Sequence, residues 1–324
     1  MILAVLFFVL GDHYLRLMTF IALFVLTLTG HMIFLGYTGQ ILLCHATLMA
    51  LGGYSTAILT TKYGWPPIGG VVAGVILTII FAYLIGKVIL RLRRAYLAIA
   101  TLAIALITDA VVGNWIEVTG GHTGIVGVPP FSLGGLVFNS VESFYILAWV
   151  VALAGWLFAL HLGSSRVGRA FRAISRDEAV ASAIGIDVSR YKVQSLMLTG
   201  AYAALSGALY VHFIGLALPS SFNIMVSFEV LMAAILGGLG TVYSVFLAAP
   251  LLKFLPEMTA AAGDYKLIIY GLLFISIPMY FAGGIAGILT YIWRRLPKTI
   301  RLYFTGGIAD TLTNIWRRLP KTMR

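Results

Sequence analysis

Side chains that could carry chemistry are few and widely spaced in this sequence. None of the six histidines stands in the HxxxH or HExxH spacing that holds a catalytic metal ion. The sequence contains neither a GxxxxGK phosphate-binding loop nor a GxSxG nucleophile elbow. Its single cysteine, Cys44, excludes both an internal disulfide and a zinc site built from cysteines. We therefore expect no catalytic residue, no metal and no cofactor. The histidines are assigned interfacial or packing roles, except His45, which lies between two glycine-rich segments.

Two acidic residues, Asp109 and Glu229, lie within apolar stretches, where a charge is costly and often functional. Asp109 lies close to the end of its stretch, which favours an interfacial position. Glu229 is expected at the start of a helix, where the helix dipole stabilises a carboxylate, and the alternative is that it faces a solute path. A proton-coupled carrier would be expected to have a more central acid, and a membrane enzyme would be expected to cluster its acids or histidines.

The polar stretch at residues 165–187 is rich in arginine and predicts a short cytoplasmic helix. Ser175 is expected to cap a helix that begins at Arg176, with Glu178 as its capping-box partner. Small residues follow, and Gly185 is expected to end the helix in the left-handed conformation. The stretch is either a capped connector on the membrane surface or a protruding helix that docks in a groove of a partner protein.

The elements that position these residues are expected to be membrane helices. Hydrophobic residues make up 60% of the 324 residues and charged residues 10%, whereas soluble domains carry about 25% charged residues. The apolar runs are continuous rather than alternating, which favours helices over a β-barrel. We predict an all-α polytopic protein with about eight to nine membrane segments, counting the apolar residues 1–10 as part of a helix. The other apolar runs cover residues 17–35, 41–61, 68–90, 95–112, 144–162, 193–214, 224–255 and 267–289.

The positive charges orient these segments. Of the 22 Lys and Arg residues, 17 lie in three clusters, at residues 91–94, 166–192 and 294–324, whereas residues 112–143 and 215–227 contain none. Because positive loops stay in the cytoplasm, the clusters are expected inside and the bare loops outside. The net charge of +11 then reflects topology and anionic lipid, not nucleic acid. The basic tail would lie outside if residues 224–255 crossed once, so we predict that this region enters and leaves on the same side.

Glycines mark the expected breaks in the helices. Three of the four residues from Gly237 to Gly240 are glycines, and each costs about 1 kcal/mol inside a helix. We predict a re-entrant pair of half-helices here, and the alternative is close helix packing through small residues. A similar break is predicted at Gly36–Gln40, followed by Gly52 and Gly53. Discontinuous helices in both halves indicate a transport path near residues 36–53 and 224–241. The expected path residues are Gly36, Gln40, His45, Glu229, Gly237, Gly238 and Gly240.

The C-terminal tail carries a duplication. The segment Ile292–Thr299 recurs 23 residues later as Ile315–Thr322, and its basic amphipathic character suits anionic headgroups. We therefore divide the chain into a membrane domain, residues 1–293, and a basic cytoplasmic tail, residues 294–324.

Several motifs resemble those of branched-chain amino acid ABC-importer permeases. The resemblance covers roughly residues 35 to 287 and is closest to the M-type subunit of that family. Within it, the loop Gly168–Gly185 is similar to the ATPase-coupling segment, and Asp177, Glu178, Ala179 and Gly185 match the coupling motif position by position. The other matching runs are Gly36–Gln40 with His45–Ala46, Gly52–Tyr54, Tyr96–Ala103, Thr119–Ile125 and Leu236–Thr241.

The resemblance implies an ATP-driven importer that moves leucine, isoleucine and valine into the cytoplasm. Its partners would be a second related permease, two cytoplasmic ATPases and a periplasmic binding protein, in a bacterial inner membrane with the C-terminus in the cytoplasm. The chain itself would be no enzyme, because its ATPase partners hydrolyse the ATP. The expected coupling residues are Arg172, Arg176, Asp177, Glu178, Ala179 and Gly185.

Other functions stay open at this point. A permease of the same family could carry urea, amides or other amino acids, because function lies in the site and not in the fold. A secondary transporter or channel would need no ATPase, and deleting residues 176–185 would only perturb it. A membrane enzyme would lose turnover when His45 and His122 are replaced.

Overall fold

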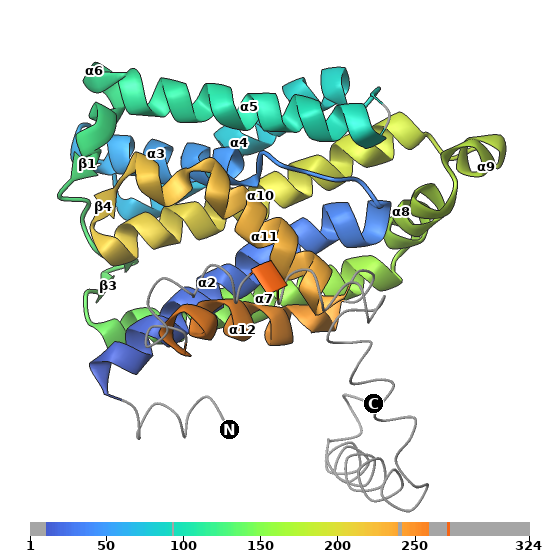
Figure 1. The fold of residues 1–324 in the computed structure, drawn as a ribbon. Helices are drawn as coiled ribbons and strands as arrows, with labels where there is room; N and C mark the ends of the chain where they lie inside the picture. Colours follow the sequence, from blue (N-terminus) through green and yellow to red (C-terminus); the bar gives the residue numbers. More distant parts are fainter. Residues whose placement is uncertain (1–10, 93, 239–241, 259–270, 273–324) are drawn as a thin grey trace, which may run out of the picture.

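The computed structural model describes residues 11–92, 94–238, 242–258 and 271–272, which form a bundle of long helices. Figure 1 shows α8 and α9 projecting at one end, here called the α9 end. The short strands and α6 lie at the opposite end, here called the β end. The helices are α2 (Asp12–Met32), η1 (Ile33–Tyr37), α3 (His45–Thr61), α4 (Pro67–Ile89), α5 (Arg94–Asn114), α6 (Ile116–Thr119), η2 (Gly121–Thr123), α7 (Val141–Ser164), α8 (Arg166–Arg176), α9 (Glu178–Ala183), α10 (Val188–Ile214), η3 (Pro219–Phe222), α11 (Ile224–Gly237), η4 (Val242–Ser244) and α12 (Val245–Met258). The strands are β1 (Ile125–Val126), β2 (Phe131–Leu133), β3 (Leu136–Phe138) and β4 (Leu216–Ala217).

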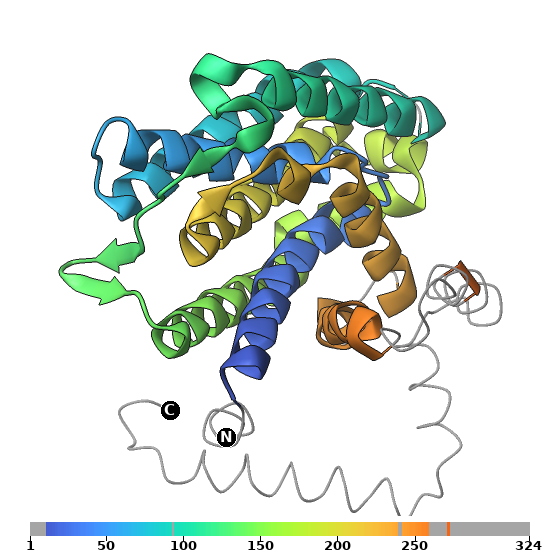
Figure 2. The same cartoon turned by 60° about the vertical axis from the view of Figure 1, so that its left-hand side comes forward.

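The bundle is organised around α2, which packs against α7, α10, α11 and α12 (Figure 2). Its most apolar window is 83% buried, the highest share of any of the long apolar helices described. Hydroxyls inside this core are satisfied: Thr27 donates to Ser206 of α10 at 2.7 Å, and Ser206 donates to the Leu23 carbonyl at 2.9 Å. Paired hydroxyls of this kind tie transmembrane helices together, because lipid offers them no other partner.

On the other side of the bundle, α10 packs against α3 and α4 through glycines. A β-carbon on Gly207 of α10 would lie 2.2 Å from the Met49 carbonyl oxygen of α3. A β-carbon on Gly52 would lie 2.3 Å from the Ala204 carbonyl oxygen. Gly52 and Gly53 therefore lie inside α3 and bring two backbones together. The helix break that precedes them in the chain ends at Cys44.

The β end is closed by two small antiparallel sheets. Ile125 of β1 lies opposite Ala217 of β4, and Phe131 of β2 lies opposite Phe138 of β3. The His212 imidazole fixes this end to the helices. Its Nδ1 donates to the Pro129 carbonyl at 2.7 Å, which leaves Nε2 to accept from the Thr56 hydroxyl at 3.0 Å. This histidine has the packing role that the sequence predicts.

Six described helical segments are long and apolar enough to cross a membrane. The predicted all-α membrane architecture is therefore confirmed. α3 and the segment Val242–Leu255 are apolar but shorter. The predicted segments at residues 1–10 and 267–289, and the duplicated tail, lie outside the described residues, apart from Gly271 and Leu272. The six segments are Asp12–Tyr37, Pro67–Ile89, Ala95–Asn114, Val141–Ser164, Val188–Ile214 and Pro219–Gly237.

The predicted pair of half-helices is present as α11 and α12. Glu229 of α11 pairs with Lys253 of α12 at 2.6 Å, while Gly237 lies close to Ser244 and Ala248. These contacts make the two helices antiparallel, so that the hairpin returns toward the end at which α11 begins. Val242, at the start of the returning half, lies beside Trp156, whose indole N–H donates to the Val242 carbonyl at 3.1 Å. Trp156 lies within α7, so the second helix of the pair begins partway along α7 and not at its end.

Candidate coupling surface and translocation path

The α9 end begins with α8, a short amphipathic helix that follows α7 directly. The Ser165 hydroxyl caps α8 by accepting a hydrogen bond from the Gly168 N–H at 3.2 Å. Phe171 is fully buried, and its ring lies 6.1 Å from the Tyr191 ring of α10. Gly168 permits close approach, because a β-carbon there would lie 2.2 Å from the Leu162 carbonyl oxygen. α8 is therefore held firmly against the bundle.

α9 begins later than the sequence predicts. Ser175 lies inside α8 and is not a cap, because the arginine-rich stretch before it is already helical. The chain leaves the helix at Asp177, whose carboxylate accepts hydrogen bonds from the N–H groups of Ala179 and Val180 at 2.8 and 3.1 Å. Gly185 has φ +86°, which confirms the predicted left-handed stop. The capping-box role predicted for Glu178 is therefore wrong, and its carboxylate is directed elsewhere.

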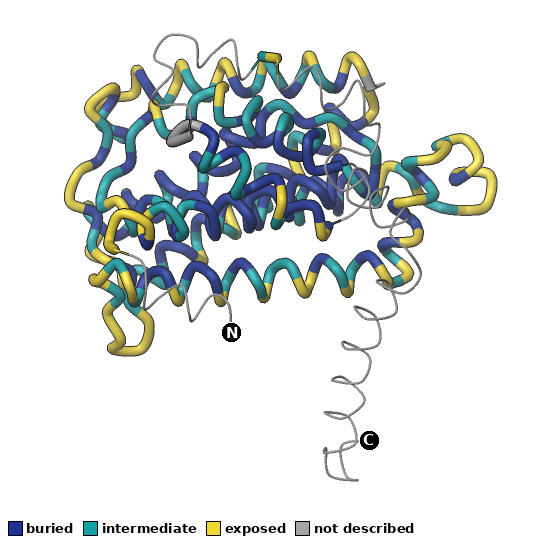
Figure 3. The backbone as a smooth tube through the Cα atoms, turned by 60° about the horizontal axis from the view of Figure 1, so that its bottom comes forward, coloured by how far each residue is buried: buried dark blue, intermediate teal, exposed yellow. Residues whose placement is uncertain are grey.

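The outer face of α9 combines apolar and charged side chains. Val180 is 60% exposed and Ile184 is 68% exposed, and Figure 3 shows this region projecting from the bundle with its residues mostly exposed. Arg172 and Arg176 are exposed on the preceding helix. The Arg172 guanidinium lies 5.9 Å from the centre of the Tyr37 ring. Exposed apolar residues rimmed by charges are typical of a surface that binds a partner protein.

Glu178 connects this surface to the segment that follows η1. Its Oε1 accepts a hydrogen bond from the Gln40 side-chain amide at 3.0 Å and pairs with the Lys192 ammonium at 2.6 Å. Gln40 is fully buried, and Lys192 is 4% exposed. Nearby, Gly39 has φ +69° and passes so close to α8 that a β-carbon would lie 2.7 Å from the Ser175 hydroxyl. The segment after η1 therefore contacts α8 and α9, and it is connected to α10 through the Glu178–Lys192 pair.

The helix break after η1 runs from Gly39 to Cys44. Gly36 lies inside the π-helical turn η1 that precedes it. The chain then runs back into the bundle, since His45, the first residue of α3, has its Nδ1 3.4 Å from the Nδ1 of His31 in α2. Both imidazoles are fully buried. Their hydrogen bond needs complementary neutral tautomers, with one Nδ1 donating and the other accepting.

The helix that follows the first break, α3, meets α11 inside the bundle. The Ala46 N–H, in the first turn of α3, donates to the Ser227 hydroxyl of α11 at 2.9 Å. At the far end of α11, Gly238 has φ +107°, a conformation that other residues rarely adopt. Glu229 lies in the second turn of α11, since Asn223 caps this helix by accepting from the Val226 N–H. The predicted position of Glu229 at the helix N-terminus is therefore wrong.

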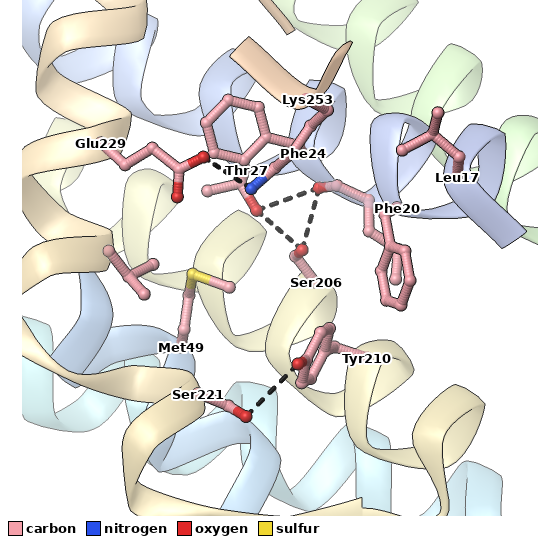
Figure 4. A pocket seen from close by; sticks show the side chains of 12 residues that line it. Leu17, Phe20, Phe24, Thr27, Met49, Ser206, Tyr210, Ser221, Glu229 and Lys253 are labelled. Carbon is pink, nitrogen blue, oxygen red and sulfur yellow. Dashed lines mark hydrogen bonds and ion pairs between the residues drawn. The ribbon is translucent and has the colours of Figure 1, made fainter. Parts of the chain in front are cut away.

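A cavity of about 340 Å³ lies between these elements. Figure 4 shows Glu229 and Lys253 directed toward each other at its edge, with Thr27 and Ser206 beside them. Tyr210 donates to Ser221 at 3.3 Å on another wall. The residues that line the cavity come from α2, α3, α10, η3, α11 and α12. They are Leu17, Phe20, Leu23, Phe24, Thr27, Met49, Ser206, Tyr210, Ser221, Val226, Glu229 and Lys253.

The structure divides the expected path residues into three places. Gly36 and Gln40 lie toward α8 and α9, His45 lies where α3 meets α11, and Gly237 and Gly238 lie at the hairpin turn. Of the expected set, only Glu229 lines the cavity, and Gly240 lies outside the described residues.

Two lysines at these sites were not predicted from the sequence. Lys192 was counted only as a topology charge, although it is buried against Glu178. Lys253 was missed within the apolar run at residues 224–255. It is the one basic residue in a run whose one acidic residue is Glu229, and this is the signal that could have identified it.

Comparison with known proteins identifies a family whose model matches most of this chain. The model of the family described as "Branched-chain amino acid transport system / permease component" matches residues 13–278. The chain is 28% identical over 284 residues to the high-affinity branched-chain amino acid transport system permease protein LivM of Salmonella typhimurium, covering 79% of this chain and 66% of LivM. It is 24% identical over 276 residues to LivH of Escherichia coli, covering 80% of this chain and 89% of LivH.

A more distant relative is the probable permease LivM of Methanocaldococcus jannaschii, 27% identical over 168 residues. The chain thus spans just under two thirds of the length of the Salmonella LivM. No solved structure matches this chain.

Proposed function

This chain belongs to the family of permease components of branched-chain amino acid transport systems, and we propose that it is the M-type membrane subunit of an ATP-driven importer. Its cargo is leucine, isoleucine and valine, which move into the cytoplasm across a bacterial inner membrane. The subunit performs no hydrolysis, which belongs to two cytoplasmic ATPases. A second related permease and a periplasmic binding protein complete the transporter, and the C-terminus lies in the cytoplasm.

The observation that carries this proposal is the position of Glu178. An ATPase-driven permease needs an exposed element that a partner can move, and a rigid connection from that element to the solute path. The exposed face of α9 provides the first. The contacts of Glu178 with Gln40 and Lys192 provide the second, because they fix α9 to the broken segment at residues 39–44. A secondary transporter or channel has no need of either feature.

In this mechanism, closure of the ATPases on ATP draws the α9 helices of the two permeases together. The motion passes through Glu178 to Gln40 and to the start of α3, and α10 moves with it through Lys192. Rigid-body rocking of the two permeases then alternates access to the path between them. The hairpin of α11 and α12 contributes to that path, because it contacts α3 through Ser227. The surface on which the ATPase acts takes its shape and charge from Arg172, Arg176, Asp177, Ala179 and Gly185.

The test is uptake of radiolabelled leucine by proteoliposomes that contain the complete transporter and its binding protein. We expect uptake that needs both ATP and the ATPases, and that Glu178→Arg abolishes. The matched control is Glu142→Arg, the same charge reversal at an exposed residue of the β end, which should leave uptake unchanged. Uptake without ATP would disprove the coupling role. ATP-dependent uptake of urea or amides in place of leucine would keep the ATPase-driven mechanism and change the cargo.

A further inference from the structure

The cavity between α2, α10 and the α11–α12 hairpin holds an ion pair that topology does not require. Glu229 and Lys253 each lie in an apolar helix, where a charged side chain is costly. Their side chains stay 34% and 26% exposed, because both border the cavity instead of being enclosed by protein. A pair that served only to join two helices could be replaced by apolar residues of the same volume, often with no loss of stability.

The rest of the cavity is apolar on one side and hydroxylated on the other. Leu17, Phe20 and Val226 offer hydrocarbon surface, and the Phe24 ring lies 4.4 Å from the Lys253 ammonium. Thr27 and Ser206 place hydroxyl oxygens close to the pair (Figure 4). A volume of about 340 Å³ suits a small solute, since ligand pockets range from about 300 to 1,000 Å³.

We propose that this cavity is a binding site for a zwitterionic α-amino acid with an apolar side chain. The inference rests on the proposed function and assigns it a site. The solute ammonium binds the Glu229 carboxylate, and the solute carboxylate binds the Lys253 ammonium, so that each charge of the opened pair finds a new partner. The apolar side chain lies against Leu17, Phe20 and Val226. Both the charged and the apolar half of the solute then have matching partners in the cavity wall.

Charge neutrality gives the site its selectivity. The resident pair carries no net charge, so a net-neutral zwitterion leaves every charge matched. An apolar acid or an apolar amine would leave one protein charge unpaired, which is strongly unfavourable away from water. Urea and simple amides carry no charge that could separate Glu229 from Lys253. The site therefore distinguishes amino acids from the other cargoes open to this family.

The test measures protection of a cysteine in the cavity wall, which makes it independent of the binding protein. The variant is Val226→Cys in a Cys44→Ala background, within the complete transporter in nanodiscs. Alkylation of this chain by N-ethylmaleimide is followed by mass spectrometry, without nucleotide and with ATP. The probes are leucine, 4-methylpentanoate (leucine without its ammonium) and isopentylamine (leucine without its carboxylate), each at saturating concentration.

Leucine is expected to slow alkylation at least roughly tenfold in one nucleotide state, whereas neither analogue protects. Removing the charge of either Glu229 or Lys253 should then reverse the preference for leucine over one of its analogues. Glu229→Gln should let 4-methylpentanoate protect and make leucine ineffective, and Lys253→Gln should do the same for isopentylamine. The matched controls are Asp109→Asn and Lys87→Gln, which remove charges outside the cavity and should keep the leucine pattern.

Three results would overturn this assignment. The first is no protection by leucine in either nucleotide state. The second is protection of the unaltered site by the two analogues that is as strong as protection by leucine. The third is retention of the leucine pattern by both charge variants. If the charge variants do not assemble, the comparison of leucine with its analogues in the unaltered site decides alone. Each of these results is distinct from failure of the proposed function, which would appear as loss of ATP-driven leucine uptake by the wild-type transporter.

Discussion

The ion pair between Glu178 and Lys192 joins a half-exposed carboxylate to a buried ammonium. The two atoms lie 2.6 Å apart, and the side chains are 39% and 5% exposed, respectively. Lys192 lies in the second turn of α10, whereas Glu178 opens α9 and also accepts from Gln40. This asymmetry predicts that the two residues respond differently to substitution.

Glu178→Ala should destabilise the subunit by about 2 kcal/mol, because it leaves the buried Lys192 ammonium without its partner. Lys192→Met should cost less than about 1 kcal/mol, since the Glu178 carboxylate can turn to solvent. The double variant should recover part of the loss. Denaturant titration of the complete transporter measures this, with alkylation of the fully buried Cys44 thiol as the probe. Equal losses in both single variants would show that the pair is not asymmetric in energy.

The cap of α9 predicts a local effect. α9 has six residues and needs its cap, because so short a helix has little stability of its own. Asp177→Ala should cost about 1 kcal/mol and speed hydrogen exchange at the N–H groups of Ala179 and Val180. The conservative Asp177→Asn keeps an acceptor oxygen and should preserve most of the protection. ATP-driven uptake should fall with the first change and be nearly normal with the second, and equal exchange in both variants would contradict this account.

Much of the fold could be predicted from the sequence because membrane helices depend on long apolar runs. The predicted segments at residues 17–35, 68–90 and 193–214 correspond to α2, α4 and α10, with ends that differ by a few residues. The charge distribution predicted that residues 224–255 turn back, and the antiparallel pair of α11 and α12 agrees with it. Both predictions rest on the cost of placing polar groups in lipid, which is local and readable along the chain.

The contacts within the site could not be predicted in the same way. Gln40 and Glu178 are 138 residues apart, and Glu229 and Lys253 meet only because a hairpin folds back. No periodicity encodes such pairs, because each depends on where two separate helices end. The error at Ser175 has the same origin, since a possible cap acts only where the preceding residues are not already helical.

The close approach of α3 and α10 predicts a severe effect at Gly207. A β-carbon there would lie 2.2 Å from the Met49 carbonyl oxygen, and backbone cannot move aside easily. Gly207→Ala should cost at least about 2 kcal/mol, with reduced yield of assembled transporter. The control is Gly200→Ala on the same helix, whose β-carbon would meet its nearest neighbour, the Ala82 β-carbon, at 3.3 Å. Gly200→Ala should assemble at a clearly higher yield, and equal yields would indicate that the helices separate without cost.

The turn of the hairpin depends on Gly238. Its φ of +107° is open to glycine but strained for any residue with a β-carbon. Gly238→Ala should therefore cost about 1–3 kcal/mol. The strain should also shift the hairpin and lower leucine uptake more than assembly, because α11 carries Glu229 and Ser227. Gly69→Ala is the control: it lies in the first turn of α4, and its nearest neighbour would be 3.4 Å away, so it should be neutral or slightly stabilising. Uptake per assembled transporter compares the two variants. If Gly238→Ala lowered assembly alone, with normal uptake in what assembled, the turn would serve folding and not the path.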